Sequence, residues 1–411
     1  MTESSRREFI IQTAGALTAM ALLPSIPAIA RQQGDPLGVA LVGAGRQGRS
    51  ILGELGKLEG FRVMGVCDSD ESRLSSGLRR VQGAKGFADH RKMLDELPEA
   101  SAIFIATPTH LHRQVAVDAL QAGRHVYCEA PLSNTVEDCR AMVQAAQAAP
   151  KLVFASGLEG RSNPIYKLAR SFYRSDAVRD AVAIEAQQFQ KTSWRFPASN
   201  PARENEVNWR LDPAVSLGLP GEEGVHQFDV ALWFTDRLPA SATGGGSIRL
   251  WDDGRNMADT TFSTLRFDNG LYMHHQASLA NSYGGRTETL RGSNATIKLA
   301  WTAAWMFKEA DAPTQGWEVY ANRQQFHNEE GITLIADATK LASQGKLKEG
   351  VGLPNPPLYY ALADFLASIR AGEPAVCTAP DGLRATVVAI HAAKAVMTGE
   401  EQVIDPSLYE V

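Results

Sequence analysis

Between residues 37 and 156, short apolar runs alternate with longer segments in which apolar residues recur every three or four positions. The short runs predict β-strands, and the longer segments predict amphipathic helices. We expect strands at 38–42, 61–67, 102–106, 125–128 and 152–155, and helices near 46–59, 70–80, 89–97, 109–122 and 135–149. This alternation predicts a parallel sheet with helices on both faces, a Rossmann-type domain over residues 36–156.

The pattern changes beyond residue 156, where longer strands follow one another with few helices between them. We expect a helix near 162–175, strands at 181–190, 240–250, 259–267, 271–280 and 284–291, and helices near 333–345, 356–370 and 380–396. The run Asp268-Asn269-Gly270 is typical of a hairpin turn. Parallel pairing needs long crossover connections and none is expected here, so the second sheet should be mostly antiparallel. The chain is therefore expected to be an α/β protein whose C-terminal α+β domain, 157–411, carries a large open sheet.

A glycine-rich run, Gly43-Ala44-Gly45-Arg46-Gln47-Gly48, directly follows the first predicted strand. The first glycine permits a tight turn, the second lets the backbone approach a pyrophosphate, and the third lets the helix pack close to the sheet. The start of that helix offers free N–H groups and a positive dipole end to phosphates. Such a run can also be an ordinary tight turn, so its context decides the interpretation.

The second predicted strand ends in Asp68, about 20 residues after the last glycine, where a carboxylate would hold the ribose hydroxyls of a dinucleotide. Asp68 could also cap the next helix, and both roles can coexist. Strand, glycines, helix and acid in this order predict dinucleotide binding. The cofactor-binding residues expected here are Gly43, Gly45, Arg46, Gln47, Gly48 and Asp68. Because Asp68 would repel a 2′-phosphate, NAD is expected rather than NADP.

The N-terminus has the pattern of a secretory signal. Arg6-Arg7 precede a short apolar stretch, Ala14 to Leu23, and then Ala28-Ile29-Ala30. A basic region, a short apolar region and a small-residue cleavage site predict a signal peptide over 1–30, and the paired arginines indicate the twin-arginine type. An uncleaved anchor or a disordered end is the alternative. This route carries folded proteins, so we expect a periplasmic protein whose cofactor is loaded before export and stays tightly bound.

The composition is that of a soluble globular protein. The 411 residues suggest two domains, and 44% hydrophobic and 21% charged residues are ordinary values. The net charge of −5 argues against nucleic acid as a partner, and the apolar stretch near the N-terminus is too short for stable membrane insertion. The 4 cysteines have no metal-type spacing, and His274-His275 would point to opposite faces of a strand, so we expect no metal site.

Three further segments, together with the turn above, resemble the Gfo/Idh/MocA oxidoreductases. They are Ala106-Thr107-Pro108-Thr109-His110-Leu111-His112, Ala122 to Pro131, and Glu222 to Asp229, the last preceded by Trp209-Arg210. The family consists of two-domain NAD(P)-dependent enzymes that act mainly on sugars and cyclitols. The resemblance covers nearly all of the chain after the signal, and it looks most like the exported members.

The resemblance implies roles for residues of the first domain. Thr107 and Pro108 would line the nicotinamide side, and His112 would support that loop, although it can equally be a helix-face histidine in a satisfied hydrogen bond. Glu129 matches the glutamate of the family's E-K-P motif, near the nicotinamide ribose. Pro131 matches the proline of that motif, which in the family often follows a cis peptide bond.

The chain departs from the family at Ala130, where the motif has lysine. In the family that lysine hydrogen-bonds the reacting alcohol and places positive charge beside a developing alkoxide. Such charge can contribute a few kcal/mol to a transition state. Simple family-style alcohol oxidation is therefore in doubt, unless Lys191, Arg161 or Arg210 reaches in from the second domain.

The other half of the site is expected around His226. In the family a D-x-x-x-H pattern opens a helix and directs both side chains toward the nicotinamide, and here Glu222 takes the place of the aspartate. Four residues along one helix would bring the carboxylate beside the imidazole, which would fix its tautomer and raise its basicity. Asp229 would lie on the same face. Glu222, His226 and Asp229 are therefore the expected catalytic residues.

Aromatic and cationic side chains suit a polyol substrate, so the expected substrate contacts are Arg161, Tyr166, Trp209 and Arg210. We expect hydride transfer between a carbohydrate-like substrate and a retained NAD, in a homodimer or homotetramer. Loss of the lysine leaves two alternatives open. One is a redox-neutral glycosidase or lyase that oxidises its sugar only transiently, and the other is a non-catalytic sugar-binding protein.

Overall fold

The computed structural model describes residues 35–411, apart from residues 199, 317, 319–320, 337–340 and 342–351. The predicted signal peptide, residues 1–30, lies outside the described residues. By its internal contacts the described chain divides into two compact units. One comprises Pro164–Ala183 and Thr289–Pro354, and the other comprises the described parts of Arg31–Asn163, Ile184–Glu288 and Asn355–Val411.

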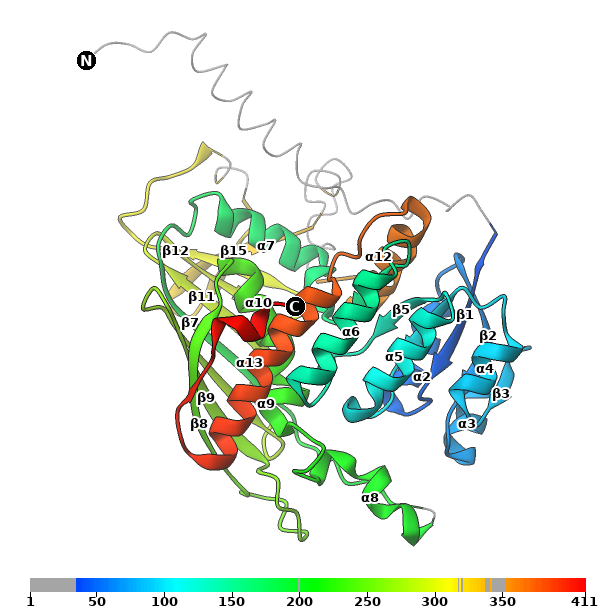
Figure 1. Ribbon diagram of the computed structural model, residues 1–411. Helices are drawn as coiled ribbons and strands as arrows, with labels where there is room; N and C mark the ends of the chain where they lie inside the picture. Colours follow the sequence, from blue (N-terminus) through cyan, green and yellow to red (C-terminus); the bar gives the residue numbers. More distant parts are fainter. Residues whose placement is uncertain (1–34, 199, 317, 319–320, 337–340, 342–351) are drawn as a thin grey trace. The chain divides into compact units, whose positions relative to one another are not determined.

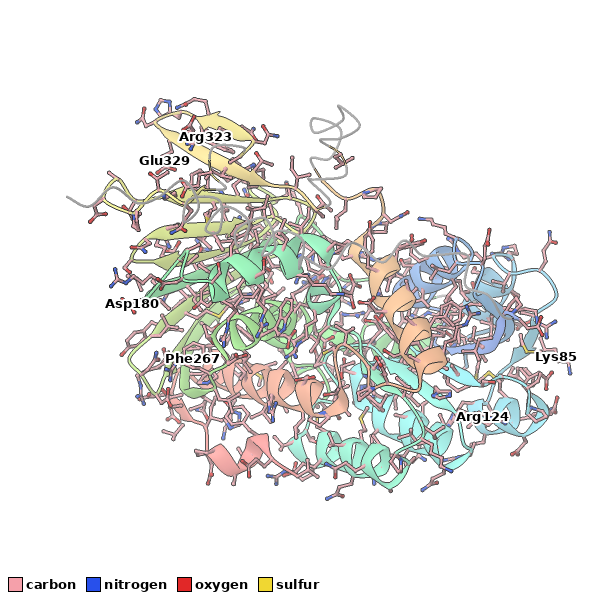
Figure 2. The ribbon with its side chains drawn as sticks, turned by 90° about the horizontal axis from the view of Figure 1, so that it is seen from above. Lys85, Arg124, Asp180, Phe267, Arg323 and Glu329 are labelled. Carbon is pink, nitrogen blue, oxygen red and sulfur yellow. The ribbon has the colours of Figure 1, made fainter. Side chains whose placement is uncertain are left out.

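The larger unit contains a parallel sheet of six strands in the order β3-β2-β1-β4-β5-β6 (Figure 1). The five predicted strands are confirmed. The sixth, β3, was not predicted, because it is only three residues long and two of them are exposed. In Figure 2, Lys85 marks this edge strand and Arg124 marks the turn that leads into β5. The bounds are β1 Leu37–Val42, β2 Phe61–Cys67, β3 Lys85–Phe87, β4 Ala102–Ile105, β5 His125–Cys128 and β6 Phe154–Ser156.

Five helices connect these strands, and polar side chains fix where several of them begin. Asp70 caps the first turn of α3 and Asp89 that of α4, because each carboxylate accepts a hydrogen bond from a backbone N–H of that turn. Thr135 does the same for α6. The helices are α2 Arg46–Leu55, α3 Glu71–Leu78, α4 His90–Glu96, α5 His112–Gln121 and α6 Val136–Ala148.

An aromatic cluster lies at the centre of the parallel sheet's core. The ring of Phe104 on β4 lies 5.7 Å from that of Phe61, 5.5 Å from that of Tyr127 and 5.6 Å from that of Phe365, centroid to centroid. Phe365 belongs to α12, Pro357–Ala371, near the C-terminus. The chain thus returns from the second sheet to the first, and this helix completes the core of the nucleotide-binding half.

The second sheet has ten strands in the order β14-β15-β13-β12-β11-β7-β10-β9-β8-β16, and the unit boundary falls within β7 and β11. It is mostly antiparallel, as predicted, with one exception. Strand β7 pairs with β10 in parallel. The chain between these two strands contains three helices and two other strands of the same sheet. The bounds in the larger unit, including the two strands that cross the boundary, are β7 Ala181–Phe189, β8 Pro239–Ser247, β9 Thr260–Phe267, β10 Tyr272–Ser278, β11 Arg286–Gly292 and β16 Gln402–Val403.

The predicted hairpin joins β9 to β10, with Gly270 at φ 83° in the left-handed region that glycine adopts without strain. The consecutive histidines of β10 point to opposite faces, as predicted. His275 is buried against Gln227, whereas His274 is bonded to Thr264 on the exposed face. Helix α13, Ala379–Thr398, begins with a reciprocal capping box between Thr378 and Asp381 and runs along β8 (Figure 1).

The remaining helices of the larger unit are short, apart from α10. They are α8 Glu204–Val207, α9 Gly218–Glu222 and α10 Gly224–Thr235, with 3-10 turns at Thr109–Leu111, Glu159–Arg161, Pro201–Arg203, Trp209–Leu211 and Pro406–Tyr409. The crossing loop, as we call residues 191–209, contains the turn at Pro201–Arg203 and α8, and it ends where the turn Trp209–Leu211 begins. All four cysteines, Cys67, Cys128, Cys139 and Cys377, are buried and form no disulfide.

In its described residues, the smaller unit has one helix and a set of antiparallel strands. These are α7 Pro164–Arg174, β12 Ala295–Leu299, β13 Ala304–Lys308, β14 Arg323–Phe326 and β15 Glu329–Leu334. Arg323 and Glu329 mark the β14–β15 hairpin in Figure 2. The helix predicted at 333–345 is wrong at its first two residues, which belong to β15, where side chains 331–334 are buried as in a core strand. Most of the rest of that prediction lies outside the described residues.

Among the described residues no helix is long and apolar enough to cross a bilayer.

Candidate functional site

A cavity of about 1140 Å³ lies within the larger unit. One wall comes from the turn after β1, the end of β2 and the loops after β4 and β5. The other wall comes from the crossing loop, the α9–α10 junction and the first residue of β11. Pockets for small ligands usually measure about 300–1,000 Å³, so this cavity has room for a dinucleotide together with a small substrate. It lies at the C-terminal ends of the parallel strands, where such sheets bind ligands.

The glycine-rich turn has the geometry that a pyrophosphate requires. Gly43 has φ 94°, and a Cβ there would lie 2.5 Å from the Ala106 backbone, whereas a Cβ on Gly45 would meet nothing within 4 Å. A Cβ on Gly48 would lie 1.8 Å from the carbonyl oxygen of Gly43. No side chain caps the start of α2, so its first N–H groups remain available to an anion. Four of the predicted residues line the cavity: Gly43, Gly45, Arg46 and Gln47. Gly48 does not line it and instead packs behind the turn, against Gly43.

Asp68 lies at the end of β2 and lines the cavity. Its Oδ2 accepts a hydrogen bond of 2.7 Å from the backbone N–H of Ala44 in the glycine-rich turn, and its Oδ1 accepts one of 2.9 Å from that of Asp70. Burial raises the pKa of this carboxyl, although both hydrogen bonds oppose the rise. The alternative interpretation of Asp68 as a helix cap is wrong, because Asp70 caps α3. Asp68 instead joins the turn to the second strand, with lone pairs left for ribose hydroxyls.

The loop after β4 brings Thr107 and Pro108 to the cavity, as expected. The hydroxyl of Thr107 is buried and has no hydrogen-bond partner among the described residues. His112 lies behind this loop, with Nε2 3.0 Å from the carbonyl oxygen of Thr107 and Nδ1 3.1 Å from that of Pro131. Burial lowers the pKa of His112 to about 4, so a neutral ring donates to only one of the two oxygens at a time. His112 therefore connects the loops after β4 and β5.

Glu129 follows β5 and lines the cavity beside Ala130. Its Oε1 accepts a hydrogen bond of 3.0 Å from Nε2 of Gln47, so the glycine-rich turn and the end of β5 are linked directly. Burial, and then the charge of Glu159, raise the pKa of Glu129 to about 8. The peptide bond between Ala130 and Pro131 is cis, as the resemblance implies.

Glu222 and His226 both line the cavity, but their relation differs from the prediction. Glu222 ends α9, whereas α10 begins at Gly224, so the two residues do not share one helix face. The local sequence Leu-Pro-Gly-Glu-Glu-Gly explains the break, because proline and glycine both interrupt helices. The Glu222 carboxylate accepts hydrogen bonds of 3.2 and 3.3 Å from the hydroxyl of Thr109. Glu222 thus bonds to the loop after β4, and Nδ1 of His226 has no partner among the described residues.

The titration of these two residues also differs from the expectation. Burial, and secondarily the charge of Arg286, lower the pKa of His226 to about 3, whereas a raised basicity was predicted. Burial raises the pKa of Glu222 to about 7, against the opposing effects of Arg210 and the Thr109 hydroxyl. His226 is therefore neutral throughout the physiological range, and of these two residues only Glu222 changes charge near neutral pH.

Asp229, Arg161 and Tyr166 do not line the cavity, and the prediction that places them in the site is wrong on this point. Asp229 and Arg161 form a buried bidentate ion pair, with contacts of 2.8 and 3.1 Å, and Arg161 also contacts Asp381 at 3.0 Å. The Arg161 guanidinium thus lies between the carboxylates of Asp229 and Asp381, so these charges face one another and not the cavity. Tyr166 belongs to the smaller unit, where its hydroxyl accepts a hydrogen bond of 3.2 Å from the backbone N–H of Trp301.

Trp209, the last residue of the crossing loop, and the adjacent Arg210 both line the cavity. The Arg210 guanidinium lies 4.4 Å from the ring centroid of Trp209 and 3.8 Å from the Glu222 carboxylate. Trp194, Phe196 and other residues of the crossing loop complete this wall. Lys191, the other cation considered as a substitute for the missing lysine, does not line the cavity.

Sequence reasoning missed several charged residues of the cavity, among them Glu159, Glu223 and Arg286. Glu159 opens a 3-10 turn after β6, and burial raises its pKa to about 7. Glu223 lies between α9 and α10 and accepts a hydrogen bond of 2.9 Å from Gln190. Arg286 is the first residue of β11. The usable signal was Arg286-Thr287-Glu288 on a predicted strand, because alternation places both charges on one face. No group of three or more metal-ligating side chains occurs in the described part of the chain.

Two models of one protein family match this chain. Residues 37–156 match "Oxidoreductase family, NAD-binding Rossmann fold", and residues 188–298 match "GFO/IDH/MocA C-terminal domain". Together the two matches cover more than half of the sequence. The chain belongs to the Gfo/Idh/MocA oxidoreductase family. The resemblance inferred from the motifs is confirmed, and so is NAD as the cofactor of the first domain.

Named relatives in the Gfo/Idh/MocA family include two dehydrogenases. Inositol 2-dehydrogenase 2 from Saccharopolyspora erythraea is 24% identical over 249 residues, which cover 60% of this chain and 68% of that protein. Levoglucosan dehydrogenase from Pseudarthrobacter phenanthrenivorans is 25% identical over 176 residues, which cover 43% of this chain and 43% of that protein.

Solved structures of the family share the fold. Levoglucosan dehydrogenase in complex with NADH and L-sorbose superimposes with a TM-score of 0.72 at 19% identity, over 90% of this chain and 100% of that one. Myo-inositol 2-dehydrogenase from Lactobacillus plantarum superimposes with a TM-score of 0.67 at 18% identity, again over 90% and 100%. These values establish a common architecture and leave the substrate open.

Proposed function

We propose that this protein is an NAD-dependent oxidoreductase that removes hydride from a hydroxyl-bearing carbon of a sugar or polyol. One observation carries the proposal: a single cavity has the dinucleotide-binding turn on one wall and Glu222 and His226 on the other. The substrate class is supported by the names of the relatives, since inositol and levoglucosan are both polyhydroxylated rings.

The residues present fit NAD. The uncapped start of α2 and the open space at Gly45 would hold the pyrophosphate, and Asp68 would hold the adenosine ribose. Thr107, with its unpartnered hydroxyl, and Glu129 would border the nicotinamide and its ribose. When bound, NAD supplies a hydride acceptor at nicotinamide C4.

The opposite wall of the cavity provides the proton chemistry. As the carbinol C–H bond breaks with its electron pair, the hydroxyl proton must leave, and the neutral imidazole of His226 can accept it. Glu222, with a pKa of about 7, can take up or release a proton near neutral pH. The indole of Trp209 offers an apolar face to the C–H side of a sugar ring, and the ring's hydroxyls can meet Arg210.

Two alternatives arise from Ala130 and are less well supported. A redox-neutral glycosidase or lyase would use the same cavity for transient oxidation, and a sugar-binding protein would need no proton acceptor. The named activities among the relatives are dehydrogenations, which favours net oxidation.

We further propose that the protein is exported in folded form and retains its nucleotide. The support for export is the pattern of residues 1–30, with Arg6-Arg7 ahead of the apolar stretch. The support for retention is the crossing loop, which lines the cavity opposite the glycine-rich turn and bonds to the segment after β2 through Arg203 and Asp70. Cell fractionation with an Arg6→Lys/Arg7→Lys variant tests the export. Wild-type protein should be periplasmic and the variant cytoplasmic, and an unchanged distribution would contradict the twin-arginine assignment.

An assembly of two or four copies is the companion proposal. The outward face of β9 and β10 exposes Phe262 and Tyr272, which are 60% and 44% exposed in the single chain. Such residues on an open sheet are typical of a surface covered by another subunit. Sedimentation of wild-type protein should show a dimer or tetramer, and Phe262→Asp should shift it toward monomer. A monomeric wild type would refute this proposal.

The activity is tested by mixing NAD-loaded protein with myo-inositol or levoglucosan and following the absorbance of the reduced nicotinamide. We expect reduction with at least one such polyol, and a loss of about 100-fold or more in His226→Asn with NADH binding retained. His274→Asn is the matched control, because His274 is an exposed histidine outside the cavity. Release of aglycone from a chromogenic glycoside without net reduction would favour the redox-neutral alternative. Failure of the loaded protein to reduce NAD with any polyol would contradict the proposal.

A further inference from the structure

Removing hydride from an alcohol carbon concentrates negative charge on the alcohol oxygen while its proton departs. A fixed positive charge near that oxygen stabilises the transition state, and more so in a site that excludes water. Ala130 lines the cavity and supplies no such charge. The question of which residue does so rests on the proposed function, because it concerns the oxidation step of that same site.

Two arginines on the substrate wall are candidates. Arg210 is 40% exposed, its guanidinium is stacked on Trp209, and it lies 3.8 Å from Glu222. Arg286 is only 16% exposed and lines the cavity together with His226. A charge shielded from water keeps more of its field than an exposed one. On burial alone, Arg286 is the stronger electrostatic group.

A buried network holds Arg286 in place. Its Nε donates to Oε1 of Glu288 at 3.3 Å, and the two residues share a face of β11 because they are two positions apart. The same Oε1 accepts a hydrogen bond of 3.1 Å from Nε2 of Gln227, whose Oε1 lies 3.1 Å from Nε2 of His275. Gln227, Glu288 and His275 are all at least 99% buried.

This network also connects Arg286 to the proton acceptor. Gln227 follows His226 directly in α10, so one helix turn carries both the imidazole in the cavity and the amide that anchors Glu288. Several cavity groups lie within the field of Arg286. Its charge lowers the pKa of His226 and opposes the burial-driven rise in the pKa of Glu159 and of Glu223.

We propose that Arg286, anchored by Glu288 and Gln227, supplies the positive charge at the reacting oxygen that Ala130 cannot. In the oxidation step the carbinol C–H electron pair leaves as hydride to bound NAD, which is reduced. The substrate carbon is oxidised to a carbonyl, and the O–H proton passes to His226. Arg286 exchanges no proton or electron, since it acts only through charge and hydrogen bonding at the oxygen. Glu288 and Gln227 are positioning residues for this guanidinium.

Variants can separate the charge from the fold. Arg286→Gln alone leaves the Glu288 carboxylate buried without its cation and can unfold the protein, so the double variant Arg286→Gln/Glu288→Gln removes both charges with isosteres. Arg286→Lys keeps the charge, and Glu288→Gln keeps the arginine while weakening its anchor. Arg266→Gln, which removes an exposed arginine of β9 outside the cavity, is the control.

The first measurement is the steady-state oxidation of myo-inositol and levoglucosan by NAD-loaded protein. We expect kcat to fall about 100-fold or more in the double variant, less in Glu288→Gln and least in Arg286→Lys, with the affinity for NADH unchanged in all three. Equal kcat values in wild type and double variant would overturn the proposal while leaving the proposed function intact. Absence of NAD reduction by the wild type with every polyol would instead count against the proposed function.

A second measurement needs no substrate. Sulfite, a small oxyanion that can occupy the position facing the reacting carbon, is titrated calorimetrically into NADH-loaded protein, because it would add covalently to the oxidised nicotinamide. We expect the double variant to bind sulfite at least about tenfold more weakly than wild type, with Arg286→Lys in between. Sulfite affinity that is equal in wild type and double variant, at equal NADH affinity, would show that Arg286 does not serve the reacting oxygen.

Discussion

Replacing Arg203 by alanine should speed the release of nucleotide from the cavity. Arg203 lies in the crossing loop, and its Nη1 donates to Oδ2 of Asp70 at 2.6 Å, while Nη2 lies 3.4 Å from the hydroxyl of Ser69. Asp70 in turn donates its backbone N–H to Asp68. The loop is thus bonded to the segment of the first domain that would hold the adenosine ribose.

The magnitude follows from the contacts that the alanine removes. A hydrogen bond to a charged partner contributes about 1.5–3 kcal/mol when well shielded. The Arg203 and Asp70 side chains are 23% and 11% exposed, so solvent screening reduces this to about 1–2 kcal/mol. If the loop must detach before nucleotide leaves, release should accelerate roughly 5- to 30-fold. Arg203 is the residue to change, because Asp70 also caps α3 and its loss would damage the helix.

The assay displaces bound NADH with excess NAD and follows the fall in NADH fluorescence by stopped flow. Arg237→Ala is the control, since Arg237 forms an exposed 3.5 Å pair with Asp268 away from the cavity. A release rate in Arg203→Ala equal to that of wild type, with the fold intact, would refute the argument that the crossing loop retains the nucleotide.

Three further outcomes are expected. Gly48→Ala should weaken NADH binding at least about tenfold, measured by calorimetry, because its Cβ would lie 1.8 Å from the Gly43 carbonyl oxygen. The control is Gly53→Ala in the same helix, whose Cβ meets no atom within 4 Å and which should stabilise the fold by about 0.5–1 kcal/mol in thermal unfolding. Glu129→Gln should raise the free energy of unfolding of nucleotide-free protein at pH 8 by about 2–4 kcal/mol, measured by urea titration. The pKa of Glu129 is about 8 in the folded protein and 4.5 ordinarily, so the wild type loses stability as the pH rises toward 8, and the glutamine variant does not. The kcat for polyol oxidation should rise with pH through about 7 as Glu222 ionises, and Glu222→Gln should abolish that step in the pH profile.

The nucleotide-binding half could be predicted almost completely from the sequence. Its central strands are largely buried apolar runs, and its turn needs glycines for reasons that are local to the backbone, as Gly43 and Gly48 show. Periodicity identifies the buried face of a helix but not its packing partner. The packing of α12 against the parallel sheet, with Phe365 beside Phe104, was therefore not predictable.

The substrate half was less predictable, because its side chains are placed by contacts between distant segments. The pairing of Arg161 with Asp229 joins positions 68 residues apart and takes both out of the site. The spacing of Glu222 and His226 assumed one continuous helix, and the break before Gly224 directs Glu222 to Thr109 instead. Arg286 reaches the cavity through the order of strands in a sheet, which no local motif encodes.

The predicted rise in the basicity of His226 was wrong for a related reason, since the environment of its side chain depends on distant segments. A neighbouring carboxylate raises the pKa of an imidazole, but Glu222 is bonded elsewhere and burial acts in the opposite direction. A sequence shows which titratable groups are close along the chain. It does not show how much water each of them loses, and in this cavity that loss dominates the pKa of both residues.

The central claim is that the cavity binds and retains NAD. The most direct test is to purify the protein without added cofactor, denature it, and identify and count the released nucleotide by mass spectrometry. The account predicts close to one NAD or NADH per chain. Protein that releases no nucleotide, and that then shows no heat of binding when titrated with either NAD or NADH, would contradict it.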